Sequence, residues 1–300
     1  MEIIVLGAAA GGGFPQWNSN APACNRARSG DSAAFARTQA SIAVSGNGQD
    51  WYLLNASPDL RQQINLTPEL HPQSGLRSTP IAGVVLTGGD VDVIAGLLTL
   101  REREPFCLYA TRWIHDVLDA NPIFEVLARD VVERRSVALG EPVELTGGLW
   151  VELFAVPGKV PLFLEEGSGM QPVLADETTV AAMICDGVNR ALYIPGCAAI
   201  TPDLAGRITG ADVVFFDGTM WRDDEMIIAG IGTKTGQRMG HMSLSGPNGA
   251  IATLAPLSIG QRFLLHINNS NPVLLADSPE RAEAEAAGWT VCHDGMRITL

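Results

Sequence analysis

The chain has 300 residues, of which 46% are apolar and 18% charged, and its formal net charge is −13. This much apolar sequence can bury a large core, which excludes wholesale disorder. The acidic balance argues against nucleic acid as a partner, because phosphate recognition needs a clustered basic surface. The first residues lack a basic region with a cleavage site, and no apolar run reaches about 18 residues, so we expect a soluble, cytoplasmic protein without membrane insertion.

Short apolar runs of strand length recur along the chain. They cover residues 2–6, 41–44, 51–54, 83–86, 106–109 and 150–154, and then 180–185, 191–194, 212–216, 263–266 and 289–292. Turn sequences at 45–48 and 186–187 predict hairpins between neighbouring runs.

The clearest predicted helix covers residues 279–287. Ser278 is placed to cap it, Pro279 suits its first position, and Gly288 follows its end. Weaker helical patterns lie at 93–100 and 112–118. Because strands and helices follow the same scheme in both halves, we expect one α/β domain over residues 1–300, with two sheets packed face to face and helices outside.

A glycine-rich segment, residues 7–15, follows the first predicted strand. One interpretation is a dinucleotide-binding loop, but the G-x-G-x-x-G spacing is not matched and Pro15 stands where the helix should begin. The alternatives are a tight turn that glycine relieves sterically, and a loop whose glycines bring the backbone close to a neighbouring active site.

Polar residues follow four of the predicted strands, which is where α/β folds place their chemistry. The metal ligands predicted there are Asp90, Asp92, Asp217 and His266, since carboxylate and imidazole groups suit Fe, Mn or Zn. Taken singly, each aspartate is more readily explained as a helix cap or turn residue, but four such strand ends together favour a metal site. The substrate-binding residues predicted on these segments are Asn55, Asp59, Asn268 and Asn269.

A polar segment at residues 233–243 has little helix or strand pattern. We interpret it as a mobile loop that offers Lys234, Arg238 and His241 to an anionic substrate, with His241 able to titrate; an ordinary surface loop is the alternative. The acidic run 222–225 is expected to be a solvated helix start. The other histidines are expected to be structural or at the surface: His71, His115 and His293.

Residues 86–96 resemble the T-H-x-H-x-D-H-x-x-G motif of the metallo-β-lactamase superfamily. Thr87, Asp92 and Gly96 match this motif, whereas Gly88, Asp90 and Val93 occupy its histidine positions. Residues 55–61 resemble the strand and loop near the metal in that superfamily. Residues 215–218 resemble the segment that contains its bridging aspartate, and residues 264–266 resemble the segment that contains its last histidine. The resemblance implies an αββα four-layer sandwich.

Over its full length the chain is similar to the coenzyme PQQ synthesis protein B family, through blocks at 11–18, 54–59, 96–102, 216–219, 232–236, 239–241 and 266–272. The resemblance implies a role in the biosynthesis of pyrroloquinoline quinone (PQQ). It implies hydroxylation, dependent on non-haem Fe(II), of the tyrosine ring of a Glu-Tyr dipeptide cut from the precursor peptide. The alternative is a non-catalytic carrier for PQQ or its precursor.

The resemblance also implies roles for particular residues. Asp92, Asp217 and His266 would hold the metal, with Asp90 able to assist. His241, Lys234 and Arg238 would act on the substrate. A protein this acidic must concentrate positive charge locally to handle a carboxylate-rich ligand, and Lys234 is one of the chain's two lysines.

Two departures from the family pattern carry predictions. The family has a cysteine cluster after Trp-Asn that holds a structural zinc, but Ser19 and Ala21 replace two cysteines and leave Cys24. Since such a site needs four ligands, we predict that structural zinc is absent. Val93 replaces a histidine, which leaves two carboxylates and one imidazole, the inverse of the usual iron oxygenase set.

Five cysteines without a CxxC pair fit a reducing compartment, and the apolar content permits a homodimer.

Overall fold

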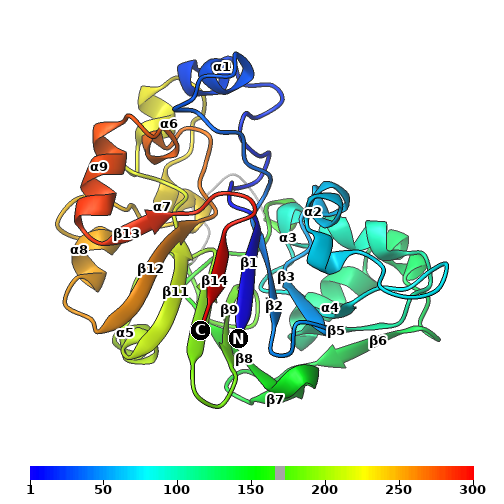
Figure 1. Cartoon of the computed structure of the whole chain (residues 1–300). Helices are drawn as coiled ribbons and strands as arrows, with labels where there is room; N and C mark the ends of the chain where they lie inside the picture. The colour runs from blue at the N-terminus through cyan, green and yellow to red at the C-terminus, as the bar shows by residue number, and fades with distance from the viewer. Residues whose placement is uncertain (166–172) are drawn as a thin grey trace.

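The computed structural model describes residues 1–165 and 173–300, and within them the strands form two seven-stranded sheets (Figure 1). The first sheet has the spatial order β14 (Arg297–Thr299), β1 (Glu2–Gly7), β2 (Ser41–Ser45), β3 (Trp51–Leu54), β4 (Ile81–Val85), β5 (Phe106–Ala110) and β6 (Val132–Ser136). The second has the order β13 (Trp289–Val291), β12 (Ile259–Leu265), β11 (Ala211–Asp217), β10 (Arg190–Ile194), β9 (Val180–Cys185), β8 (Leu149–Ala155) and β7 (Val143–Leu145).

Each sheet is antiparallel at one side and parallel at the other. In the first sheet β3, β4, β5 and β6 run parallel, and in the second β10, β11, β12 and β13 do so. The carboxyl ends of neighbouring parallel strands lie at one edge of their sheet, so the polar segments that follow β3, β4, β11 and β12 are brought to the sheet edges where function is usually placed.

The helices flank the strands, with α2, α3 and α4 on one side and α5, α8 and α9 on the other (Figure 1). Their bounds are α1 (Pro22–Arg28), α2 (Leu60–Leu66), α3 (Val91–Ile94), α4 (Arg112–Asp119), α5 (Pro202–Ile208), α6 (Glu225–Ile228), α7 (Gly236–Met239), α8 (Ala250–Leu254) and α9 (Pro279–Ala286). Short 3-10 helices cover Pro68–Leu70, Ala95–Leu100, Pro122–Val126, Thr146–Gly148, Leu162–Leu164 and Pro272–Leu274. No helix in the described ranges has the length and apolar content that crossing a membrane requires.

Strand β11 shows how the layers are stabilised. Val213 and Phe215 pack in the core that contains the apolar residues of both sheets, whereas Val214 and Phe216 pack with the buried residues of α5, α8 and α9. Side chains alternate between the two faces of a strand, so one face of β11 meets the other sheet and the opposite face meets the helices. The predicted α/β sandwich with helices outside is confirmed.

The strongest local predictions are also confirmed. Both predicted hairpins are present as the antiparallel pairs β2–β3 and β9–β10. In α9 the Ser278 side chain accepts a hydrogen bond from the Arg281 amide, and Gly288 follows with a φ of 83°. Three strands were not predicted: β6 is charged and largely exposed, while β7 and β14 have three residues each, so their apolar patterns are too short or too weak.

The last strand connects the ends of the chain. β14 pairs antiparallel with β1, and the Met1 amino group donates a hydrogen bond to the Leu300 carbonyl at 2.9 Å. The carboxyl-terminal strand therefore returns to the first sheet after the second sheet is complete. This long-range pairing has no local sequence signal.

Candidate functional site

A cavity of about 470 Å³ lies where the polar strand ends of both sheets meet. Asn55 and the segment from Thr87 to Val93 contribute from the first sheet, and Thr219 and His266 contribute from the second. The loop that contains Lys234 and His241 completes one wall. This volume lies in the ordinary range for sites that bind small molecules.

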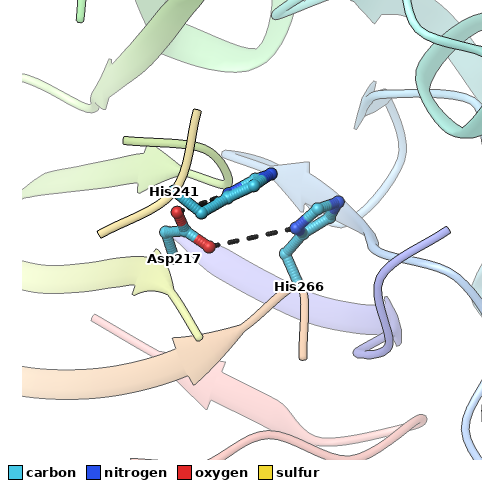
Figure 2. Close-up of side chains that lie close together, drawn as sticks. All are labelled: Asp217, His241 and His266. Atoms are coloured by element: carbon cyan, nitrogen blue, oxygen red, sulfur yellow. Dashed lines mark hydrogen bonds and ion pairs between the residues drawn. The ribbon is translucent and has the colours of Figure 1, made fainter. Parts of the chain in front are cut away.

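Three side chains in this region form a compact group (Figure 2). Among the His, Cys, Asp and Glu side chains of the described residues, one group has the spacing of a metal site. Its members are Asp217, His241 and His266, and their potential ligand atoms all lie within 4.8 Å of one another. The His241 Nδ1 atom lies 2.7 Å from Asp217 Oδ2, and the His266 Nδ1 atom lies 4.0 Å from Asp217 Oδ1. The two imidazole rings stack with centroids 5.3 Å apart.

Each member is placed by the end of an element. Asp217 is the last residue of β11 and is fully buried, in the alternating position that Phe215 also occupies. His266 directly follows β12 with a φ of 56°, a left-handed conformation that ends the strand. His241 follows Gly240, whose φ of 85° ends α7.

The Thr219 hydroxyl joins the three groups, a role that the sequence analysis did not assign. Its Oγ1 atom lies 2.6 Å from Asp217 Oδ1, 2.8 Å from His266 Nδ1 and 3.2 Å from His241 Nδ1. Backbone amides of Thr219 and Cys197 also donate to the Asp217 carboxylate, each at 3.0 Å. Burial alone would raise the pKa of Asp217, but both histidines and the Thr219 hydroxyl outweigh it and hold that pKa below its ordinary value.

Asp92 lies in the first turn of α3 and contacts the far nitrogen of His266. Its Oδ2 atom is 3.0 Å from His266 Nε2. Burial disfavours both charges, yet the contact lowers the pKa of Asp92 and raises that of His266. Asp90 accepts a hydrogen bond from the Leu162 amide at 3.2 Å, and burial together with the Asp92 charge raises its pKa.

Two of the four predicted metal ligands belong to the group of three. Asp217 and His266 belong to the group of three, but the third member is His241, which the sequence analysis placed with the substrate. Asp92 touches this group through His266, and Asp90 lies in the cavity wall. No feature of the sequence near His241 indicates its partner, because Asp217 lies 24 residues away in the chain.

The basic residues predicted to act on the substrate, Lys234 and Arg238, meet Glu165. Arg238 Nη2 lies 2.8 Å and Lys234 Nζ 3.9 Å from Glu165 Oε2. Lys159, to which the sequence analysis gave no role, lies 3.0 Å from the other oxygen. The segment interpreted as a mobile loop includes the short helix α7.

The predicted substrate-binding residues separate into two kinds. Asn55, Asn268 and Asn269 line the cavity, although Asn55 also donates hydrogen bonds to Thr87 and Tyr193. Asp59 lies outside the cavity lining and accepts hydrogen bonds from the backbone and side chain of Gln39. Three of the four therefore lie where a ligand can reach them.

The glycine-rich segment approaches the site. Gly11 lines the cavity, and a Cβ atom on it would lie 3.5 Å from the Asp92 carboxylate. The first helix after this segment, α1, begins only at Pro22. These positions favour the interpretation in which glycines bring the backbone close to an active site.

Cys24 is buried, and its thiol lies 3.7 Å from the Asn269 side-chain oxygen. In the described part of the chain Cys24 joins no group of three with metal-site spacing. The absence of structural zinc stays a prediction.

Outside the site, His115 is buried and His71 and His293 are more exposed, consistent with their expected roles. The 222–225 run leads into α6, but Glu225 is not fully exposed. Its carboxylate accepts from the Trp221 and Arg222 amides and from Ser270, and it is partly buried.

Comparisons with known proteins agree with this fold. A family profile described as "Beta-lactamase superfamily domain" matches residues 50–267. The crystal structure of a diphosphatase from the PhnP family superposes with a TM-score of 0.70 at 21% identity, covering 99% of this chain and 96% of the other, which shows a shared fold. The protein is a member of the β-lactamase superfamily.

More specific relatives cover the whole chain. Coenzyme PQQ synthesis protein B of Gluconacetobacter diazotrophicus is 61% identical over 305 residues, covering 100% of this chain and 99% of the relative. The crystal structure of Zn²⁺-bound PqqB from Methylobacterium extorquens has a TM-score of 0.98 and 56% identity, and each chain covers 100% of the other. The chain belongs to the coenzyme PQQ synthesis protein B family.

Proposed function

We propose that this protein acts in PQQ synthesis by hydroxylating the tyrosine ring of a Glu-Tyr-derived precursor, with iron(II) held by Asp217, His241 and His266. The observation that carries the proposal is the group of two imidazoles and one carboxylate at the wall of a cavity of ligand size. Membership in the PQQ synthesis family supports the choice of substrate.

The donor set suits iron(II). Two histidines and one carboxylate with open positions form the ligand set of non-haem iron(II) oxygenases. The ligand set predicted from the sequence has two carboxylates and one histidine, and His241 supplies the second imidazole. Iron(II) bound there would supply the activation of dioxygen that hydroxylation of the ring requires.

The surrounding side chains hold this donor set in place. The Thr219 hydroxyl and two backbone amides fix the Asp217 carboxylate, and Asp92 fixes the outer nitrogen of His266. Hydrogen bonds of this kind orient metal ligands and strengthen them as donors. The cavity would place the substrate ring beside the group, and the lysines that line the same cavity would bind its carboxylates.

The experiment is anaerobic loading of metal-free protein with Fe(II), followed by addition of a Glu-Tyr dipeptide, dioxygen and a two-electron reductant such as ascorbate, because each hydroxylation puts one oxygen atom of O₂ into the ring and reduces the other to water. Mass spectrometry of the dipeptide should show added oxygen atoms with the wild type. His241→Ala should bind Fe(II) at least tenfold more weakly and give no oxygenated product. His293→Ala, which changes an exposed histidine, is the matched control. Wild-type activity in His241→Ala would refute the assignment.

A non-catalytic carrier is the second candidate function, and Val93 favours it. This apolar side chain lines the cavity at a position where the superfamily motif has a histidine. A carrier would bind PQQ or a late precursor equally well with and without metal and would convert neither. Calorimetric titration of both forms with PQQ, together with the mass spectrometry above, separates the two candidates.

A further inference from the structure

Four charged side chains meet beside the cavity, and two of them, Lys159 and Lys234, line it. The Glu165 carboxylate contacts Lys159 at 3.0 Å, Arg238 at 2.8 Å and Lys234 at 3.9 Å. The Glu165 side chain is 6% exposed, whereas those of Lys159, Arg238 and Lys234 are 13%, 17% and 38% exposed. Three cations therefore surround one carboxylate, so these four described side chains together carry a charge of +2.

This concentration of positive charge is unusual for the chain. Its net charge is −13, and Lys159 and Lys234 are its two lysines. Both lysines line the cavity that contains His241 and His266. Positive charge placed in a cleft of an acidic protein attracts anions to that cleft.

The cations are also placed close to the histidine group. The Lys159 side chain packs on Gly240, since its Cγ atom lies 3.1 Å from where a Cβ atom on Gly240 would be. His241 is the next residue. Arg238 belongs to α7, whose first turn is capped by the Thr235 hydroxyl. A ligand held by these cations therefore extends toward His241.

Glu165 has the chemistry of the ligand that such cations would bind. Its contacts with Arg238 and Lys159 lower its pKa to about 2, so it is a carboxylate at neutral pH. It comes directly after the 3-10 helix Leu162–Leu164, and Leu162 lines the cavity. The carboxylate thus enters the basic cluster from the chain's own backbone, beside the cavity.

We propose that Lys159, Lys234 and Arg238 form a carboxylate-binding subsite of the cavity, and that Glu165 is its internal occupant, displaced when a carboxylate of the ligand binds. The identity of that ligand, a polycarboxylate such as PQQ or its dipeptide precursor, rests on the proposed function. A ligand without carboxylates gains nothing from the subsite and leaves Glu165 in place. The competition therefore selects for carboxylate ligands at some cost in affinity.

The test measures binding of PQQ, which has three carboxylic acid groups, and of its uncharged trimethyl ester to metal-free full-length protein. Glu165→Gln removes the competing charge and keeps the cations, so PQQ should bind about tenfold more tightly. Lys159→Met removes one cation, so PQQ should bind about tenfold more weakly. Affinity for the trimethyl ester should stay within about twofold in both variants. Glu152→Gln, which breaks an ion pair with Arg207 outside the cavity lining, should leave both affinities unchanged.

Removal of Glu165 leaves three cations facing one another, so thermal unfolding is measured for each variant. The double variant Glu165→Gln/Lys159→Met relieves this repulsion and should bind PQQ within about threefold of the wild type. Weaker PQQ binding by a folded Glu165→Gln would overturn the proposal, because Glu165 would then position the cations instead of competing for them. An unchanged affinity in Lys159→Met, or no PQQ binding by either wild type or Glu165→Gln, would overturn it as well.

These results are separable from the proposed reaction. The binding pattern described above without any hydroxylation supports the subsite and contradicts the hydroxylase. Hydroxylation by the wild type without tighter PQQ binding by Glu165→Gln contradicts the subsite alone.

Discussion

The Thr219→Val substitution tests whether one hydroxyl organises the histidine and aspartate group. Valine has nearly the shape of threonine, so the change removes the Oγ1 atom with little effect on packing. That atom contacts Asp217 Oδ1 at 2.6 Å and His266 Nδ1 at 2.8 Å. The Thr219 amide keeps its own hydrogen bond to Asp217 at 3.0 Å in the variant, so the carboxylate is not left bare.

The size of the effect follows from these contacts. A hydrogen bond to a charged group contributes about 1.5–3 kcal/mol to stability. Since Asp217 is fully buried and loses one of its hydrogen-bond donors, the free energy of unfolding of the metal-free protein should fall by about 2–3 kcal/mol. In the metal-loaded protein, loss of a group that orients ligands should weaken metal affinity about 10–100-fold.

The assay combines thermal unfolding of the metal-free protein with calorimetric titration of Fe(II) under anaerobic conditions. Thr219→Ser keeps the hydroxyl and should restore most of the metal affinity. Thr201→Val removes the cap of α5 outside the cavity lining, and should lower stability without changing metal affinity. If Thr219→Val bound Fe(II) as tightly as the wild type, the hydroxyl would have no organising role and the reasoning would be refuted.

Three further predictions concern other parts of the molecule. Val93→His adds an imidazole at the cavity wall and should raise the metal affinity, measured by calorimetry, at least tenfold. Val91→His, at an exposed position two residues earlier, should leave the metal affinity unchanged. Equal affinities in the two variants would show that residue 93 does not reach the metal. Gly96→Ala places a Cβ atom 2.1 Å from the Ser57 carbonyl oxygen and should lower the free energy of unfolding by more than about 2 kcal/mol. Gly206→Ala has open space around it in α5 and should raise the free energy of unfolding by about 0.5–1 kcal/mol. Denaturant unfolding measures both changes, and changes of the same sign would contradict the prediction. Asp186 accepts hydrogen bonds from the Val188 and Asn189 amides and from the Met1 amino group, and these contacts outweigh burial and lower its pKa in the folded state. A carboxylate with a lowered pKa stabilises the fold at pH values above its ordinary pKa of 3.8, and this stabilisation is lost as the pH falls below that value, so the difference in the free energy of unfolding between wild type and Asp186→Asn should be about 1–2 kcal/mol at pH 7 and shrink below about pH 4. A difference that grew on acidification would contradict this prediction.

The sequence by itself determined the class of fold and the segments that carry the chemistry. Alternating and apolar runs of strand length record which residues lie on a buried strand, because side-chain direction within a strand is a local property. Polar residues such as Asn55, Asp217 and His266 mark where those strands end. The resemblance at 86–96 added the superfamily, and the family match over the whole chain agrees with it.

Only the tertiary structure decided which of these residues meet. Asp92 and His266 are 174 residues apart and come from different sheets, so their contact depends on how the two sheets pack. His241 reaches Asp217 only because Gly240 ends α7 at that point. Asp59 follows a strand that ends near the site, yet its carboxylate is held by Gln39 instead.

The charged cluster gives the clearest physical reason. Lys159 and Glu165 lie in one segment, and Lys234 and Arg238 lie in another about 70 residues further along the chain. Lys234 falls within a block that resembles the family, but no motif links the two segments. The composition shows that basic residues are scarce in this acidic chain, so an anionic ligand requires several of them to lie close together. Electrostatic interactions depend on distance in space, which a sequence does not specify, so only the fold determines that both lysines line one cavity and contact the same carboxylate.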